Sequence, residues 1–180
     1  MTMTDDIALA CRLAEAARAA IRPHFRAQVQ SERKADASPV TVADRAAEEA
    51  MRRILTAEVP QDGVIGEEFG ATEGRSGRSW VLDPIDGTTG FLAGRPLFGT
   101  LIALVVDGWP VMGLIDQPIL GERWIGAAGR PTRSTAWRRA PAPATRWPMP
   151  RSPPPGRITS TITRPRISWP WRQRPITSAW

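Results

Sequence analysis

The stretch WVLDPIDGTTGF, at residues 80–91, determines how the rest of this sequence is interpreted. Its first three residues are apolar, as in a buried strand, and they deliver Asp83 to the end of that strand. Pro84 disfavours a helix at this point. Asp86 follows three residues after Asp83, so that two carboxylates can converge on one hard cation. The alternative is that both aspartates only shape a turn, but the joint spacing with the neighbouring motifs favours a metal site.

The segment GTT, at residues 87–89, is suited to the start of a helix. Backbone N–H groups at a helix start have no partner within the helix, and the helix dipole places positive charge there. Such a position binds phosphate readily. Carboxylates that hold a metal beside a phosphate-binding turn are the components of metal-assisted phosphoryl transfer to water.

A second acidic segment, VIGEE at residues 64–68, also ends an apolar run with two acids. Taken alone, these two glutamates would be solvated surface residues, but with Asp83 and Asp86 they supply enough oxygen ligands for Mg²⁺. The chain has one cysteine, Cys11, and one histidine, His24. This composition excludes a disulfide framework, a thiolate zinc site and a Ser-His-Asp hydrolase, so a metal site must use oxygen ligands.

Two amphipathic helices are expected before these motifs. Apolar residues recur every three or four positions from Asp5 onward, and Pro23 should end or kink this helix. Thr41 and Asp44 match the Ser/Thr-x-x-Asp/Glu capping pattern. A second helix should therefore begin near Thr41 and end before Pro60.

Short strands are expected in the rest of the sequence up to residue 129. They lie at residues 64–66, 80–82, 100–106, 111–115 and 123–126. The pair Asp107-Gly108 is typical of a hairpin turn. Helices followed by sequential strands indicate an α+β fold in which helices cover a largely antiparallel sheet.

Charge divides the sequence into two parts. Residues 1–129 carry 13 basic and 18 acidic residues, a net charge of −5, whereas residues 130–180 carry 11 arginines and no acid. Residues 131–180 also contain 11 prolines and no Leu, Val or Phe, so they offer little to bury in a core. We therefore expect a metal-binding half-domain at residues 1–129 and an unstructured basic tail, without a domain, at residues 130–180.

The sequence has no run of 18 apolar residues. Its start, MTMTDDIALA, carries two acids where a signal peptide needs positive charge. We expect a soluble, cytoplasmic protein with neither a membrane nor a nucleic acid as its partner.

The string DPIDGTTGF, preceded by GEE and before that by VTVAD, resembles the inositol monophosphatase family of Mg²⁺-dependent, lithium-sensitive phosphatases. The resemblance covers about residues 1–133, and the stretches at residues 34–52 and at 94–104 with 113–132 are most similar to the bacterial histidinol-phosphatase branch. It implies the N-terminal half of a layered α/β/α/β/α sandwich. It also implies hydrolysis of a small phosphorylated metabolite, with histidinol phosphate as the leading substrate and inositol phosphate or a related sugar phosphate as the alternative. An intact family member is expected to be a homodimer.

The resemblance also implies a ligand set for two or three Mg²⁺ ions. Glu67, Asp83 and the carbonyl oxygen of Ile85 would bind one ion, and Asp83 with Asp86 would bind a second. A bound metal ion lowers the pKa of its water and stabilises the leaving oxygen, in agreement with the chemistry inferred above.

Three further roles follow from the same resemblance. Thr88 and Asp44 would orient the attacking water and help to deprotonate it, with Glu67 close by. The amides of Gly87 and Thr88 would hold the phosphate. From spacing alone, Asp44 also fits as the capping acid of the second helix, and one side chain can fill both roles.

The tail requires a separate interpretation, because the family normally extends far beyond 180 residues and supplies a Trp-Asp motif that this chain lacks. Where relatives often continue Thr-x-Phe-Asn-Gly, this chain has TRSTA at residues 132–136. Loss of one base at codon 134 would convert Phe-Asn-Gly codons into Ser-Thr-Ala codons. We infer that residues from about 134 are a frameshifted translation, and that the chain as written is truncated and inactive.

A binding module is the alternative from a different functional class. The tail's arginines and interleaved tryptophans could hold phosphate backbones and stack on single-stranded bases. Sequencing the gene through codons 125–180 separates the two interpretations. An intact frame, with no continuation of the family in a shifted frame, would rule out the frameshift.

Overall fold

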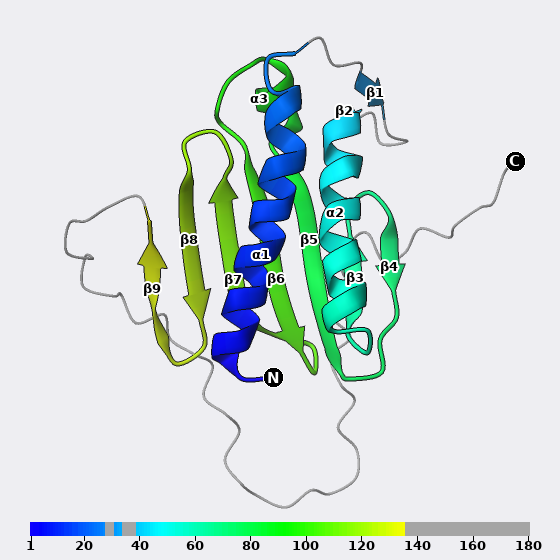
Figure 1. Cartoon of the computed structure of the whole chain (residues 1–180), viewed down its shortest axis with the longest axis vertical. Helices are drawn as coiled ribbons and strands as arrows, with labels where there is room; N and C mark the ends of the chain where they lie inside the picture. Colours follow the sequence, from blue (N-terminus) through cyan, green and yellow to red (C-terminus); the bar gives the residue numbers. More distant parts are fainter. Residues whose placement is uncertain (28–30, 34–38, 136–180) are drawn as a thin grey trace, which may run out of the picture. The chain divides into compact units, whose positions relative to one another are not determined.

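A computed structural model describes residues 1–27, 31–33 and 39–135 of the chain (Figure 1). The helices are α1 (Met3–Ile21), the short 3-10 helix η1 (Arg22–His24), α2 (Val42–Glu58) and α3 (Thr88–Leu92). The strands are β1 (Ser31–Arg33), β2 (Pro39–Thr41), β3 (Gly63–Gly66), β4 (Gly70–Thr72), β5 (Arg78–Asp86), β6 (Gly99–Val106), β7 (Trp109–Gln117), β8 (Glu122–Ala127) and β9 (Arg130–Ser134). The frameshift and nucleic-acid interpretations of the tail fall on residues 136–180, outside the described residues.

The main sheet has the strand order β4-β3-β5-β6-β7-β8-β9. Strands β3 and β5 pair in parallel, and the other neighbours pair antiparallel. Helices α1 and α2 lie side by side across one face of this sheet (Figure 1). The expected α+β fold with a largely antiparallel sheet is therefore confirmed. Among the described residues, no helix combines the length and the apolar character needed to cross a bilayer.

Both long helices begin at the capping residues that the sequence contains. Thr2 caps α1 by a reciprocal box with Asp5, and hydrogen bonds from Thr2 lower the pKa of the Asp5 carboxyl. Thr41 caps α2 by the same arrangement with Asp44. Helix α1 ends before Pro23, as expected, because proline cannot continue the hydrogen-bond ladder.

The core lies between the two helices and the sheet. Trp80 and Leu82 on β5, and Ile102 and Leu104 on β6, alternate with less buried residues along their strands. This period of two is the pattern of a sheet that buries one face under helices. Because the apolar residues of β5 must stay buried under the helices, the register of β5 is fixed. The same register fixes where its acidic residues lie along the strand.

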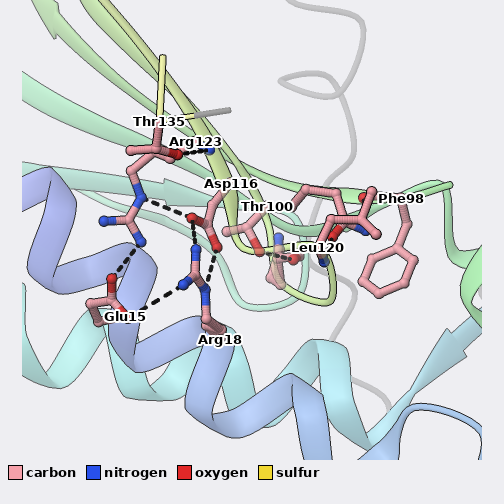
Figure 2. A network of polar contacts seen from close by, with 10 residues as sticks. Glu15, Arg18, Phe98, Thr100, Asp116, Leu120, Arg123 and Thr135 are labelled. Atoms are coloured by element: carbon pink, nitrogen blue, oxygen red, sulfur yellow. Dashed lines mark hydrogen bonds and ion pairs between the residues drawn. The ribbon is translucent and has the colours of Figure 1, made fainter. Parts of the chain in front are cut away.

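A buried carboxylate, Asp116, joins α1 to the sheet (Figure 2). Its oxygens accept hydrogen bonds from Arg18 of α1 at 2.6 and 3.1 Å and from Arg123 of β8 at 2.8 Å. Arg123 also donates to Glu15 at 2.8 Å. Burial alone would lower the pKa of the Arg123 guanidinium, but the charge of Asp116 and the bond to Glu15 raise it above its ordinary value. Asp116 is thus held between two cations from elements distant in sequence.

The structure extends past the boundary that we placed at residue 129. Strand β9 pairs antiparallel with β8, although all five of its residues are exposed. Strand β4 is likewise exposed throughout. Both strands lie at the edges of the sheet, where backbone pairing needs no apolar alternation in the sequence. The pattern of buried residues could not reveal either of them.

The sheet face opposite the helices is apolar and partly open. Val81, Leu101, Ala103, Ile115 and Trp124 line a surface pocket there. Ile115 is 49% exposed. Contiguous apolar surface of this kind promotes association.

We expect the 180-residue chain to self-associate through this face, and Ile115→Lys to weaken that association, because burying a lysine ammonium is costly. Sedimentation velocity over a range of concentrations measures the effect. Leu120→Lys is the matched control, since Leu120 is 59% exposed and lies in the turn between β7 and β8, away from the pocket. If Ile115→Lys and Leu120→Lys self-associate to the same extent, association through this face is contradicted.

Candidate active site

Two acidic positions lie side by side where the pairing of β3 with β5 stops. The two strands are parallel, and Gly66, the last residue of β3, lies opposite Leu82 in their register. Glu67 directly follows β3. Asp83 lies within β5, opposite Leu101 of β6, so the expectation that a strand ends at Asp83 is wrong: pairing with β6 continues β5 to Asp86. The backbone N–H of Glu67 donates to the carbonyl of Leu82 at 3.2 Å, which continues the pairing by one step. The predicted convergence of the two acidic segments is present in the backbone.

The DPID segment contains an irregularity in the sheet. Asp83 lies opposite Leu101 of β6 and Asp86 lies opposite Gly99, so β5 has one more residue than β6 between these pairs. The buried hydroxyl of Thr100 donates to the carbonyl of Pro84 at 2.8 Å and so fixes the bulged backbone. Bulges of this kind redirect side chains at the ends of strands. The two aspartates thus flank a bulge that Thr100 holds.

Helix α3 begins directly after the bulge. Gly87 caps it with φ 91° and ψ 39°, a left-handed conformation that favours glycine. A Cβ at this position would lie 3.0 Å from the carbonyl oxygen of Leu97. The Thr88 hydroxyl donates to the carbonyl of Ile85 at 3.1 Å. The family resemblance assigns the Thr88 hydroxyl to the attacking water and the Ile85 carbonyl to the metal ion, so this bond joins the two groups.

Asp44 lies at the start of α2 with its side chain buried. Its Oδ2 accepts hydrogen bonds from the backbone N–H of Thr41 at 2.8 Å and from the Thr41 hydroxyl at 2.5 Å. These are the contacts of a capping acid, so that interpretation of Asp44 is confirmed. Strand β2, which ends at Thr41, contacts both α2 and α3. The role of Asp44 toward water stays a prediction.

The chemistry of the donors suits a hard divalent cation. Glu67, Asp83, Asp86 and the carbonyl of Ile85 offer only oxygen atoms, which Mg²⁺ prefers. Oδ1 of Asp83 is shielded from solvent, and a cation held there would stabilise a carboxylate in such surroundings. Within the described ranges, no group of three or more His, Cys, Asp or Glu side chains is arranged as a metal site. The site thus fits Mg²⁺ in the type of its donor atoms and in the adjacent positions of Glu67 and Asp83.

Two residues near this site escaped the sequence analysis. Thr100 is polar at a position where the alternation of β6 places a buried residue. Glu48 is charged, yet it lies on the apolar stripe of α2 together with Ala47 and Met51. Each is a polar residue at a position where the periodicity of its helix or strand predicts an apolar, buried one, and this signal could have identified both.

Comparison with known proteins identifies the family. The inositol monophosphatase family model matches residues 3–152. Histidinol-phosphatase of Mycobacterium tuberculosis is 46% identical over 127 residues, which are 70% of this chain and 49% of that protein. The bifunctional phosphatase IMPL2 of Arabidopsis thaliana chloroplasts is 52% identical over 123 residues, which are 67% of this chain and 36% of that protein.

A solved inositol monophosphatase from Zymomonas mobilis has the same fold, with a TM-score of 0.64 and 55% identity. The match covers 75% of this chain and 52% of that one. The chain thus spans about half the length, or less, of the relatives that it matches. On the family match, the identities and the shared fold, the chain belongs to the inositol monophosphatase family.

Proposed function

We propose that this chain carries the first half of the active site of a Mg²⁺-dependent phosphatase that hydrolyses a small phosphomonoester. The observation that supports this most strongly is the parallel pairing of β3 with β5, because it places Glu67 and Asp83 side by side where that pairing stops. The bulge with Asp86 and the left-handed Gly87 follow directly on the same segment. Acidic ligands and a helix start are thereby adjacent, as metal-assisted phosphoryl transfer requires.

In this proposal Glu67, Asp83, Asp86 and the Ile85 carbonyl would hold the ions. When bound, Mg²⁺ supplies a water of lowered pKa and stabilises the developing charge on the leaving oxygen. The amides of Gly87 and Thr88 would bind the phosphate oxygens at the start of α3.

Thr88 is suited to orient the attacking water. A threonine hydroxyl has one hydrogen to donate and two lone pairs to accept with. Its hydrogen is directed at the Ile85 carbonyl, at 3.1 Å between the oxygens. The Thr88 oxygen therefore has acceptor capacity for a proton of the water, and Asp44 at the start of α2 would take part in removing that proton.

L-Histidinol phosphate is the leading substrate of this proposal. The similarity to the mycobacterial histidinol-phosphatase supports it, as do the two stretches that resemble the histidinol-phosphatase branch. Inositol phosphate or a related sugar phosphate is the second candidate, which the similarity to the Zymomonas enzyme supports. The proposal for the full-length protein includes a cytoplasmic location and a homodimer.

A substrate panel tests the proposal. We call the product of the gene with one base reinserted at codon 134 the frame-restored protein. We expect it to release phosphate from L-histidinol phosphate faster than from inositol phosphates or sugar phosphates, only with Mg²⁺ present, and we expect the 180-residue chain to be inactive. Addition of a chelator is the control. Failure to hydrolyse any phosphomonoester in the presence of Mg²⁺ would refute the enzymatic proposal.

A further inference from the structure

A buried carboxylate on α2, Glu48, lies next to the turn that carries Glu67. Oε2 of Glu48 accepts a hydrogen bond from the backbone N–H of Glu68 at 2.7 Å, and Oε1 accepts one from the N–H of Phe69 at 3.2 Å. The side chain of Glu48 is 0% exposed. A carboxylate that has lost its hydration to this degree requires such partners. Both partners belong to the two residues that directly follow Glu67.

Arg52, one helical turn after Glu48, completes the contact. Its Nε donates to Oε1 of Glu48 at 2.7 Å. Its guanidinium also donates to the Thr72 hydroxyl at 3.1 Å and to the carbonyl of Gly70. We call Glu48 and Arg52 the α2 clamp. The α2 clamp holds the turn after β3 through Glu48 and strand β4 through Arg52.

Gly66 shows how closely the carboxylate approaches the backbone before Glu67. A Cβ at position 66 would lie 1.8 Å from Oε1 of Glu48 and 2.2 Å from its Cδ. No side chain larger than glycine fits there while Glu48 keeps its place. The carboxylate of Glu48 therefore occupies the space on one side of the strand end.

Glu67 is thus fixed from two directions. Its own N–H donates to Leu82 of β5 at 3.2 Å, and the next two N–H groups donate to Glu48. We propose that Glu48 is a positioning residue that fixes the backbone of Glu67 so that its carboxylate is preorganised to bind Mg²⁺; this inference rests on the proposed function. A ligand that is ordered before the ion arrives binds it more tightly than one that must be ordered on binding.

The test compares Glu48→Gln with Glu49→Gln in the 180-residue chain. Glutamine keeps the size of the side chain, but its amide nitrogen cannot accept a hydrogen bond. Glu49 is the matched control, because it also lies on α2 and pairs with the arginine four residues later, Arg53, at 2.6 Å, but with 56% of its side chain exposed. Hydrogen exchange followed by mass spectrometry at micromolar protein concentration, over a series of Mg²⁺ concentrations, reports both the order of the turn and the effect of the ion.

In Glu48→Gln we expect the peptide at residues 66–72 to exchange about tenfold faster or more, because a charge-assisted hydrogen bond to the turn is lost. In the wild type we expect Mg²⁺ to slow exchange in this peptide and in the peptide that contains Asp83. Glu48→Gln should raise the Mg²⁺ concentration at which exchange is slowed half-maximally by about tenfold. This factor equals the expected increase in the exchange rate, because the same lost hydrogen bond causes both. Glu49→Gln should change neither quantity.

The outcomes separate the positioning role from the proposed function. If Mg²⁺ slows exchange equally in the wild type and in Glu48→Gln, Glu48 only stabilises the turn and the positioning proposal is overturned. If Mg²⁺ has no effect on the wild type, the proposed metal site itself is contradicted. If Glu48→Gln unfolds, with rapid exchange also in α1, Glu48→Asp replaces it, because this variant keeps an anion beside Arg52 but its side chain is one methylene too short to reach the amides of Glu68 and Phe69. A Mg²⁺ midpoint in Glu48→Asp equal to that of the wild type would then contradict positioning by Glu48.

Discussion

Asp83→Asn or Asp86→Asn is expected to lower the turnover of the frame-restored protein by about 100-fold or more, because activation of water and stabilisation of the leaving oxygen fail together. Asparagine keeps the size of the side chain and its preference for turns, but it removes the charge that binds a metal ion. The structure places the two aspartates on either side of the β5 bulge, where a turn role and a metal role are both possible. Phosphate release at saturating substrate measures the difference.

Asp107→Asn is the matched control for this pair. Asp107 is also an aspartate of a turn, with a left-handed φ of 49° in the hairpin between β6 and β7. Asparagine adopts this conformation readily, so we expect Asp107→Asn to retain normal turnover. Thr88→Ala should lower turnover while it leaves Mg²⁺ affinity largely intact, because the Thr88 hydroxyl is assigned to water. Normal turnover in both Asp83→Asn and Asp86→Asn would show that these residues only shape a turn.

Asp116→Ala is expected to have the largest effect on stability, a loss of about 3–5 kcal/mol in the free energy of unfolding. Asp116 is 0% exposed and lies between Arg18 and Arg123 (Figure 2). Its removal leaves two largely buried guanidinium groups without their shared anion, and it breaks the link from Arg18 of α1 to β7, so that only the bond from Arg123 to Glu15 remains. The cost arises from the uncompensated charges more than from the lost attraction.

The pair of Arg12 and Glu58 provides the control for Asp116. It also joins two separate elements, α1 and α2, but its side chains are 50% and 39% exposed. Water screens such a pair, so Glu58→Ala should cost about 0–1 kcal/mol. Urea denaturation of the 180-residue chain, at concentrations below those of self-association, gives both values. Equal losses for Asp116→Ala and Glu58→Ala would contradict the importance given to the buried network.

The elements that the sequence could predict are those with local signals. Thr2 and Thr41 cap the two long helices through contacts three residues away, and the Asp107-Gly108 pair marks the hairpin of β6 and β7. Strand β9 had no such signal, because an exposed edge strand is defined by its pairing with β8 and not by its own side chains. Local patterns thus located the covered strands, and the edges of the sheet depended on tertiary pairing.

The candidate site divides in the same way. The DPIDG and GEE segments predicted acids at the ends of two strands. The parallel register of β3 with β5 puts Glu67 and Asp83 side by side, but only Glu67 follows a strand end, because β5 continues to Asp86. The groups that hold these segments could not be predicted. Glu48 reaches amides 20 and 21 residues away, and Arg18 reaches Asp116 across 98 residues. Such contacts depend on how α1 and α2 pack on the sheet, which the local sequence does not encode.

A calorimetric titration of Mg²⁺ into the frame-restored protein tests most directly whether this chain supplies the metal ligands. We expect the wild type and Asp107→Asn to bind Mg²⁺ with equal, saturable heats. Asp83→Asn should lose this binding, although its fold, judged by its circular dichroism spectrum, is unchanged. Equal Mg²⁺ affinity in the wild type and in Asp83→Asn would contradict the metal site at the ends of β3 and β5.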